Sequence, residues 1–184
     1  MLYLMTSPRV YLSLQAEIDA AIREGRISSP VVSDREARTL PYLQAAIKEG
    51  LRIWPPGTGL LAKQVPPEGD TINGVFLPGG TNIGVNTWAV LRAPEVFGED
   101  ADIFRPERWL EATPEQYAKM ERASEWVWGY GKYVCLGKNV ALIELNKVFV
   151  EASRKSNLPE PCGKEYWLTF SSFFDTSIGH LLTP

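Results

Sequence analysis

The chain has 184 residues, of which 45% are hydrophobic and 22% charged, a composition typical of a folded globular domain. Its net charge of −3 gives no electrostatic reason to expect nucleic-acid binding, and one histidine with two cysteines is too few for a zinc site of four protein ligands or for a disulfide framework. No segment is long and apolar enough to predict a transmembrane helix, and the N-terminal residues lack the pattern of a secretory signal peptide.

Three helices are predicted in the first third of the chain. Segment 9–24 carries apolar residues at helical spacing and is followed by Gly25, which suits a helix end. Ser33 and Glu36 have the spacing of a capping box, which predicts a short helix there. Segment 40–53 repeats the amphipathic helical pattern.

The pattern changes between residues 58 and 85, where proline and glycine are frequent and helical periodicity is lost. The sequence Ile-Asn-Gly-Val at 72–75 predicts a hairpin, because Asn-Gly suits a type I′ turn. We expect 81–85 to be the partner strand in one small antiparallel sheet.

The remaining elements are again mostly helical. A short helix is predicted at 86–91, followed by a proline-rich meander to about residue 110 and a helix at 113–122. A last helix is predicted at 136–151. The predicted fold class is therefore mainly α with a small antiparallel β-sheet.

Segment 128–137 reads Trp-Gly-Tyr-Gly-Lys-Tyr-Val-Cys-Leu-Gly and places Cys135 between Gly131 and Gly137. An aromatic residue, Trp128, stands seven positions before the cysteine. Glycine lets backbone lie close to a flat group without a Cβ clash, and the positive end of the following helix favours thiolate over thiol. The pattern indicates a thiolate that faces a metal macrocycle.

Two other interpretations of this cysteine remain open from the residues alone. A single cysteine in an apolar setting is usually a buried structural thiol. A disulfide between Cys135 and Cys162 is also compatible with the sequence, whereas a metal ligand requires Cys135 to be free.

Two further motifs precede the cysteine. Glu49 and Arg52 are separated by three positions on a predicted helix, so they share a face and can pair, although a surface ion pair is the simpler interpretation. Segment 104–109 (Phe-Arg-Pro-Glu-Arg-Trp) has an aromatic anchor at each end, and its proline suits a turn or extended backbone.

In this order, the three motifs resemble the cytochrome P-450 superfamily of haem-thiolate monooxygenases, over roughly residues 1–151. Segments 67–74 and 130–133 are most similar to fungal pisatin-demethylase-like members. The resemblance implies an incomplete, C-terminal haem-ligating portion of that fold, and it implies that 152–184 is a divergent tail with no family match.

The resemblance also implies a cofactor, haem, with Cys135 as the axial thiolate ligand and the metal ligand. The implied cofactor-binding residues are Trp128, Gly131, Lys132, Tyr133, Gly137 and Lys63. Tyr133 stands where the family often has arginine, so Lys132 or the Tyr133 phenol would bond a haem propionate without the bidentate fork of arginine. For Lys63, a propionate contact and a solvated strand lysine are equally open.

Other roles follow from the same resemblance. Glu49, Arg52 and Arg108 would form a buried structural network on the ligand side, and Gly59, Leu60 and Leu61 would contact a small hydrophobic organic substrate. A flavoprotein reductase would dock near the cysteine loop. Its basic contacts would be Lys132, Lys138 and Arg122; an ordinary solvated surface is the alternative, and it is the favoured interpretation for Arg122.

The implied function is insertion of one oxygen atom from dioxygen into an organic substrate. No Ala-Gly-x-x-Thr-like run of the oxygen-activating helix is present, so a non-catalytic haem-binding or orphan fragment is the alternative, and a structural protein without haem is a third. The family usually lies at the cytosolic face of the endoplasmic reticulum membrane. With no anchor in this sequence, we expect a cytoplasmic location and no membrane span.

Overall fold

The computed structural model describes residues 2–57 and 62–155. Its helices are α1 Leu2–Met5, α2 Pro8–Arg23, α3 Asp34–Ala37, α4 Pro41–Ile53, α5 Thr87–Val90, α6 Pro94–Phe97, α7 Glu107–Glu111, α8 Pro114–Ser124 and α9 Lys138–Lys155, with 3-10 turns η1 Glu125–Trp128 and η2 Gly131–Tyr133. The strands are β1 Lys63–Gln64, β2 Asp70–Ile72, β3 Val75–Leu77 and β4 Asn82–Ile83. The predicted class, mainly helical with a small antiparallel part, is confirmed.

Local sequence signals explain the first helices. Helix α2 has proline at its first position and ends before Gly25, whose φ of +66° suits glycine. The predicted capping box at Ser33 and Glu36 is present at the start of α3. The helices predicted over 9–24 and 40–53 therefore form within one or two residues of their expected limits.

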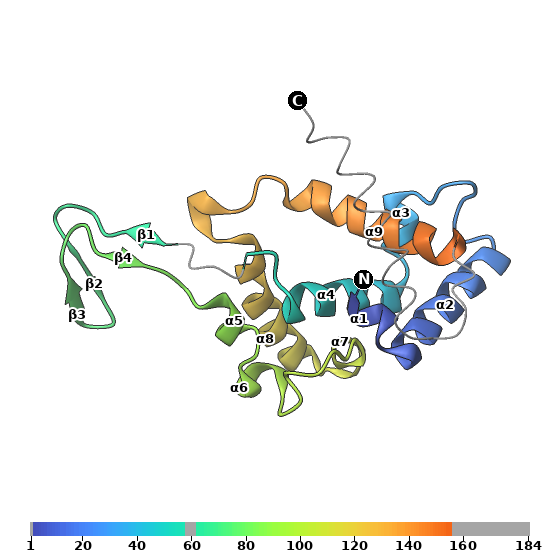
Figure 1. The fold of residues 1–184 in the computed structure, drawn as a ribbon, viewed down its shortest axis with the longest axis horizontal. Helices are drawn as coiled ribbons and strands as arrows, with labels where there is room; N and C mark the ends of the chain where they lie inside the picture. Colours follow the sequence, from blue (N-terminus) through green and yellow to red (C-terminus); the bar gives the residue numbers. More distant parts are fainter. Residues whose placement is uncertain (1, 58–61, 156–184) are drawn as a thin grey trace.

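Helix α4 lies at the centre of the helical part, between α2, α7, α8 and α9 (Figure 1). Leu43 and Ile47 face a core cluster shared with α2 and α9, whereas Ala45 faces a second cluster that contains Phe97 and Trp109. Because α4 is covered on two sides, its polar residues are enclosed along with its apolar ones.

The β-strands lie at one end of the molecule, away from the helices (Figure 1). The hairpin prediction is confirmed: β2 pairs with β3 across Asn73 and Gly74, which have φ values of +51° and +81°. The prediction of one sheet with 81–85 as the partner strand is wrong. Strand β4 pairs with β1 instead, so the described residues form two separate two-stranded sheets.

Two boundaries in the second half differ from prediction. The meander contains α6 and α7. The turn predicted at Pro106 is confirmed: its φ of −56° and ψ of −31° suit a turn that leads into α7, and the Arg108 N–H donates to the Arg105 carbonyl at 3.2 Å. Helix α9 begins at Lys138, two residues later than predicted, and continues to Lys155. Among the described residues, no helix is long and apolar enough to cross a membrane.

Candidate functional site

The loop that carries Cys135 closes on itself between η1 and α9. The Cys135 backbone N–H donates to the Trp128 carbonyl at 2.7 Å, and the Val134 N–H donates to the Gly131 carbonyl at 3.1 Å. Cys135 is an exposed free thiol, so the buried structural thiol is not what the structure shows. It precedes the N-terminus of the 18-residue helix α9, where the helix dipole is positive.

The glycines of this loop differ in what requires them. At Gly129, φ is +77° and an added Cβ would lie 2.7 Å from the Tyr133 carbonyl oxygen, so both conformation and space exclude a side chain. Gly131 has a positive φ of +58° but open space around it, and a Cβ at Gly137 would meet Cys135 Sγ at an ordinary 3.8 Å. The tightest position in this loop, Gly129, was not among the expected site residues, because the motif does not tell which of its glycines lies against another part of the backbone.

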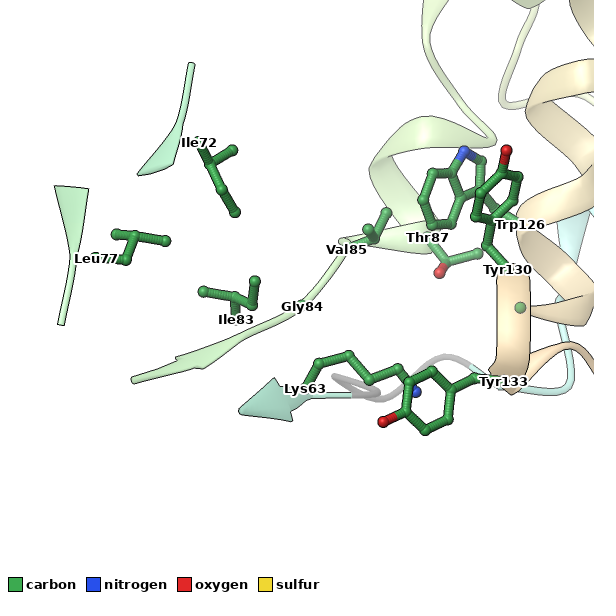
Figure 2. A pocket seen from close by; sticks show the side chains of 11 residues that line it. Lys63, Ile72, Leu77, Ile83, Gly84, Val85, Thr87, Trp126, Tyr130 and Tyr133 are labelled. Atoms are coloured by element: carbon green, nitrogen blue, oxygen red, sulfur yellow. The ribbon is translucent and has the colours of Figure 1, made fainter. Parts of the chain in front are cut away.

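Three of the expected residues meet beside the loop. Lys63 Nζ lies 3.6 Å from the centroid of the Tyr133 ring, and Lys132 Nζ lies 5.1 Å from it. Figure 2 shows Lys63 and Tyr133 side by side in the lining of a cavity of about 560 Å³. The structure therefore places two cations and a phenol at one edge of the loop, as an acidic ligand edge would require.

The cavity itself is largely apolar and lies between the strands and the cysteine loop (Figure 2). Its apolar and aromatic lining residues are Ile72, Leu77, Ile83, Val85, Trp126, Tyr130 and Tyr133. Trp126 and Tyr130 stack with ring centroids 5.7 Å apart. Cys135 does not line this cavity. Trp128 is half-buried, and Lys138 Nζ lies 5.8 Å above its ring.

Helix α4 carries a buried ion network. Arg52 binds both carboxylate oxygens of Glu49 through Nε and Nη2, at 2.9 and 2.7 Å. Arg108 Nε donates to Glu49 Oε1 at 3.0 Å. Glu49 and Arg52 are fully buried and Arg108 is 3% exposed, so the surface ion pair considered from sequence is not what forms.

Backbone groups of the meander satisfy the rest of this network. Arg52 donates to the carbonyls of Leu91 and Ala101, while Arg108 donates to the carbonyl of Phe97. Such bonds matter because a buried guanidinium with unmet donors is costly. No sequence signal identifies these partners, since any residue type can supply a carbonyl.

Two further members of the network, one donor and one acceptor, are side chains that the motifs did not single out as partners. Trp109 Nε1 donates to Glu49 Oε2 at 2.9 Å, and Asp100 accepts from Arg108 at 2.8 Å and Arg105 at 2.6 Å. Partial burial raises the pKa of Asp100, but the hydrogen bonds from Arg108 and Arg105 outweigh it and hold the pKa below the ordinary value.

Arg92 is a further cation that sequence reasoning missed. Its guanidinium lies 3.4 Å from the Trp88 ring centroid, donates to the Ile53 carbonyl at the end of α4, and pairs with Asp102 at 3.2 Å. Burial and the charge of Arg52 lower the pKa of Arg92. The only sequence signal was its position after the short helix at 86–91.

The expected substrate contacts, Gly59, Leu60 and Leu61, lie outside the described residues. The basic contacts expected for a redox partner are mixed with acids: Lys138 pairs with Glu125 at 2.7 Å, while Lys132 and Arg122 are exposed.

The protein side chains available here fit a cofactor whose metal ion is already bound by most of its ligands. Within residues 2–57 and 62–155, no group of three His, Cys, Asp or Glu side chains could hold a metal ion, so Cys135 offers a single ligand. An exposed thiol on a glycine-rich loop matches one face of a haem. Lys63, beside Tyr133, matches its acidic edge.

Comparison with known proteins identifies the family of the chain. The sequence profile of the family described as Cytochrome P450 matches residues 1–152. The chain is 51% identical over 155 residues to cytochrome P450 monooxygenase ABA1 of Pyricularia oryzae (strain 70-15), covering 84% of this chain and 30% of that protein. It is 46% identical over 158 residues to aba1 of Botryotinia fuckeliana (86% and 31%) and 37% identical over 165 residues to pisatin demethylase of Fusarium vanettenii (90% and 30%). The chain thus spans about a third of the length of these relatives.

Proposed function

This chain belongs to the cytochrome P450 family, and from that premise we propose that it forms the thiolate-bearing part of a haem monooxygenase that inserts one oxygen atom of dioxygen into an organic substrate. The observation that carries the proposal is the free, exposed Cys135 thiol on a closed loop at the N-terminus of α9. Relatives named as monooxygenases support the reaction class.

When bound, haem supplies the iron at which dioxygen is activated. The chain's own residues supply the ligand and its support. Cys135 would supply the thiolate ligand, and the Cys135 N–H bond to the Trp128 carbonyl keeps the loop closed around it. Lys63 and Tyr133 would neutralise and hydrogen-bond the acidic edge of the cofactor.

The buried network holds this loop's surroundings rigid. Glu49 joins α4 to Arg108 of α7 and to the backbone N–H of Arg105, at 2.9 Å. Ligand geometry on a rigid support is better defined than on an isolated loop. We assign Glu49, Arg52 and Arg108 the role of fixing α4 against α7 and the meander; α4 in turn packs against α8 and α9, the helices before and after the ligand loop.

A second candidate function is haem binding without oxygen activation. The observation that favours it is the exposure of the ligand loop: Leu136 is 100% exposed and Tyr130 75%, so described residues cover one face of a haem at most. In this alternative the polypeptide binds haem through Cys135 and catalyses no oxygen transfer.

The substrate and the redox partner are also proposals. The apolar lining of the cavity suits a hydrophobic organic molecule near the loop. Lys132 and Arg122 are exposed cations that suit the acidic surface of a flavoprotein reductase, whereas Lys138 is already paired with Glu125. The location at the endoplasmic reticulum stays a prediction from the family.

The ligand assignment is tested by replacing each cysteine in turn. Haemin is added to the chain, reduced, and its carbon monoxide difference spectrum recorded; we expect a strongly red-shifted Soret band. Cys135→Ser should abolish that band because a hydroxyl does not replace the thiolate, whereas Cys162→Ser should leave it unchanged. A red-shifted band that survives in Cys135→Ser would exclude this ligand.

The two candidate functions are then separated by turnover. Haem-loaded chain that receives electrons from a flavoprotein reductase, consumes dioxygen and hydroxylates a hydrophobic probe, such as a fatty acid, with the second oxygen atom leaving as water, supports the monooxygenase. A red-shifted Soret band without substrate oxidation supports haem binding alone.

A further inference from the structure

One buried polar side chain joins α9, the helix that follows the cysteine loop, to α4, the helix that carries Glu49 and Arg52. Asn146, in the middle of α9, is 2% exposed. Its Nδ2 donates to Asp34 Oδ1 of α3 at 2.7 Å, and its Oδ1 accepts from Gln44 Nε2 of α4 at 2.9 Å. Helix α3 lies against α9 at this point (Figure 1).

The polarity of this bridge is fixed by its partners. An ionised carboxylate can only accept hydrogen bonds, so the amide nitrogen of Asn146 must face Asp34 and its oxygen must face Gln44. The hydrogen bond from Arg38, at 2.7 Å, is the main cause that lowers the pKa of Asp34 and keeps it an acceptor. Gln44 uses its second amide hydrogen on the Ala37 carbonyl at 3.1 Å.

Apolar packing alone does not define how α9 is turned about its axis. Leu145, Phe149 and Val150 pack on the core, but Val140 and Ile143 on the same helix are 58% and 41% exposed. Aliphatic contacts are non-directional, so neighbouring rotations differ little in energy. A buried amide with two defined partners distinguishes one rotation from the others.

The two helices joined by Asn146 carry the two halves of the candidate site. Cys135 precedes α9 and lies about three turns before Asn146, while Gln44 lies little more than one turn before Glu49 on α4. A rotation of α9 by one residue, roughly 100°, would turn the thiol away from its present direction.

We propose that Asn146 is a positioning residue for the cysteine ligand: by binding Asp34 and Gln44 it sets the rotation of α9 relative to α4 and thereby the direction in which Cys135 faces. The inference rests on the proposed function for its consequence, but the helix placement is independent of it.

The test exchanges the two partners. In Asn146→Asp, two carboxylates face one another and the bridge breaks. In Asn146→Asp with Asp34→Asn, the new amide donates to the new carboxylate, and Gln44 can still donate to it, so both hydrogen bonds return. Asp34→Asn alone keeps an acceptor for Asn146 and serves as the matched control, and Asn146→Ala tests the loss of the bridge without added charge.

The first measurement needs no haem. In a Cys162→Ser background, spin labels on Cys135 and on Arg23→Cys, an exposed site at the end of α2, report the placement of α9 by pulsed electron resonance. We expect one narrow distance distribution in the starting protein and in Asp34→Asn, a broad or shifted one in Asn146→Asp and Asn146→Ala, and a narrow one again in the exchanged pair. Unchanged distributions in both single Asn146 variants, or an exchanged pair as broad as Asn146→Asp, would overturn the proposal.

The second measurement is the carbon monoxide difference spectrum after haemin reconstitution. The thiolate-type fraction should fall roughly tenfold in Asn146→Asp, because leaving buried polar groups unsatisfied shifts an equilibrium by about that factor, and should return in the exchanged pair. If the starting chain shows no red-shifted band, the proposed function fails while the distance measurement still decides the role of Asn146.

Discussion

At the residue scale, the buried ion network is centred on one carboxylate, that of Glu49. Glu49 accepts from two arginine side chains, from Trp109 Nε1 and from the backbone N–H of Arg105. Such networks contribute little net stability because desolvation offsets attraction, but the loss of one member leaves the others buried and unpaired. Arg52 and Arg108 would be the charges left behind.

This gives a direct prediction for Glu49→Gln. We expect the free energy of unfolding to fall by about 3–5 kcal/mol, because two buried guanidinium groups lose their counter-charge. Urea titration followed by circular dichroism measures the change. Glu115→Gln is the matched control, since Glu115 pairs with Lys119 at 2.9 Å on the surface and should leave stability nearly unchanged. Equal effects of the two substitutions would show that the Glu49 network is not what holds α4 to the meander.

The motif spacing predicted part of this arrangement. Glu49 and Arg52 share a helix face by geometry alone, so their pairing follows from sequence. Their burial does not, because it depends on the meander carbonyls of Leu91 and Ala101, which lie about forty residues or more away along the chain. Arg108 was connected to them only through the family resemblance.

At the scale of elements, the cysteine loop is shaped by its glycines and by the helix that follows. The turn at Gly129 brings the Tyr133 carbonyl against the backbone, and the Cys135 N–H then reaches the Trp128 carbonyl. The motif predicted a close approach of backbone, yet it did not tell which glycine is constrained by neighbouring atoms and which by its φ angle alone. That distinction needs the folded loop.

Two alanine substitutions separate these constraints. Gly129→Ala should displace the loop, because its Cβ would lie 2.7 Å from a backbone oxygen, and we expect most of the red-shifted carbon monoxide band to be lost. Gly131→Ala meets open space within the chain and should cost only about 1 kcal/mol of backbone strain in urea titration, less than Gly129→Ala. Equal losses of stability in the two variants would show that the contact with Tyr133 does not define the loop.

At the scale of the whole molecule, the apolar surface is unevenly covered. The two core clusters enclose α4, whereas Leu136, Val140 and Ile143 lie at helical spacing around the start of α9 and are 100%, 58% and 41% exposed. A contiguous exposed apolar patch favours association. We therefore expect the chain as given to self-associate through this face.

Sedimentation velocity tests this expectation. Replacing Val140 and Ile143 together by lysine should weaken self-association by at least about tenfold, because burial of each aliphatic side chain contributes more than the energy of a tenfold change. Leu12→Lys is the control, since Leu12 is 59% exposed on α2, distant from this face, and should leave association unchanged. A response to Leu12→Lys alone would place the contact on α2.

The amino-acid sequence by itself determined the longer helices, the Asn-Gly hairpin, the capping box and the family, because these depend on backbone preferences and spacings within a few residues. The tertiary structure decided which strands pair, how Glu49 is enclosed, and that Asn146 joins α9 to α3 and α4. Those features arise from desolvation and from directional hydrogen bonds between segments far apart in the chain. A local sequence pattern does not predict which of these segments will be in contact.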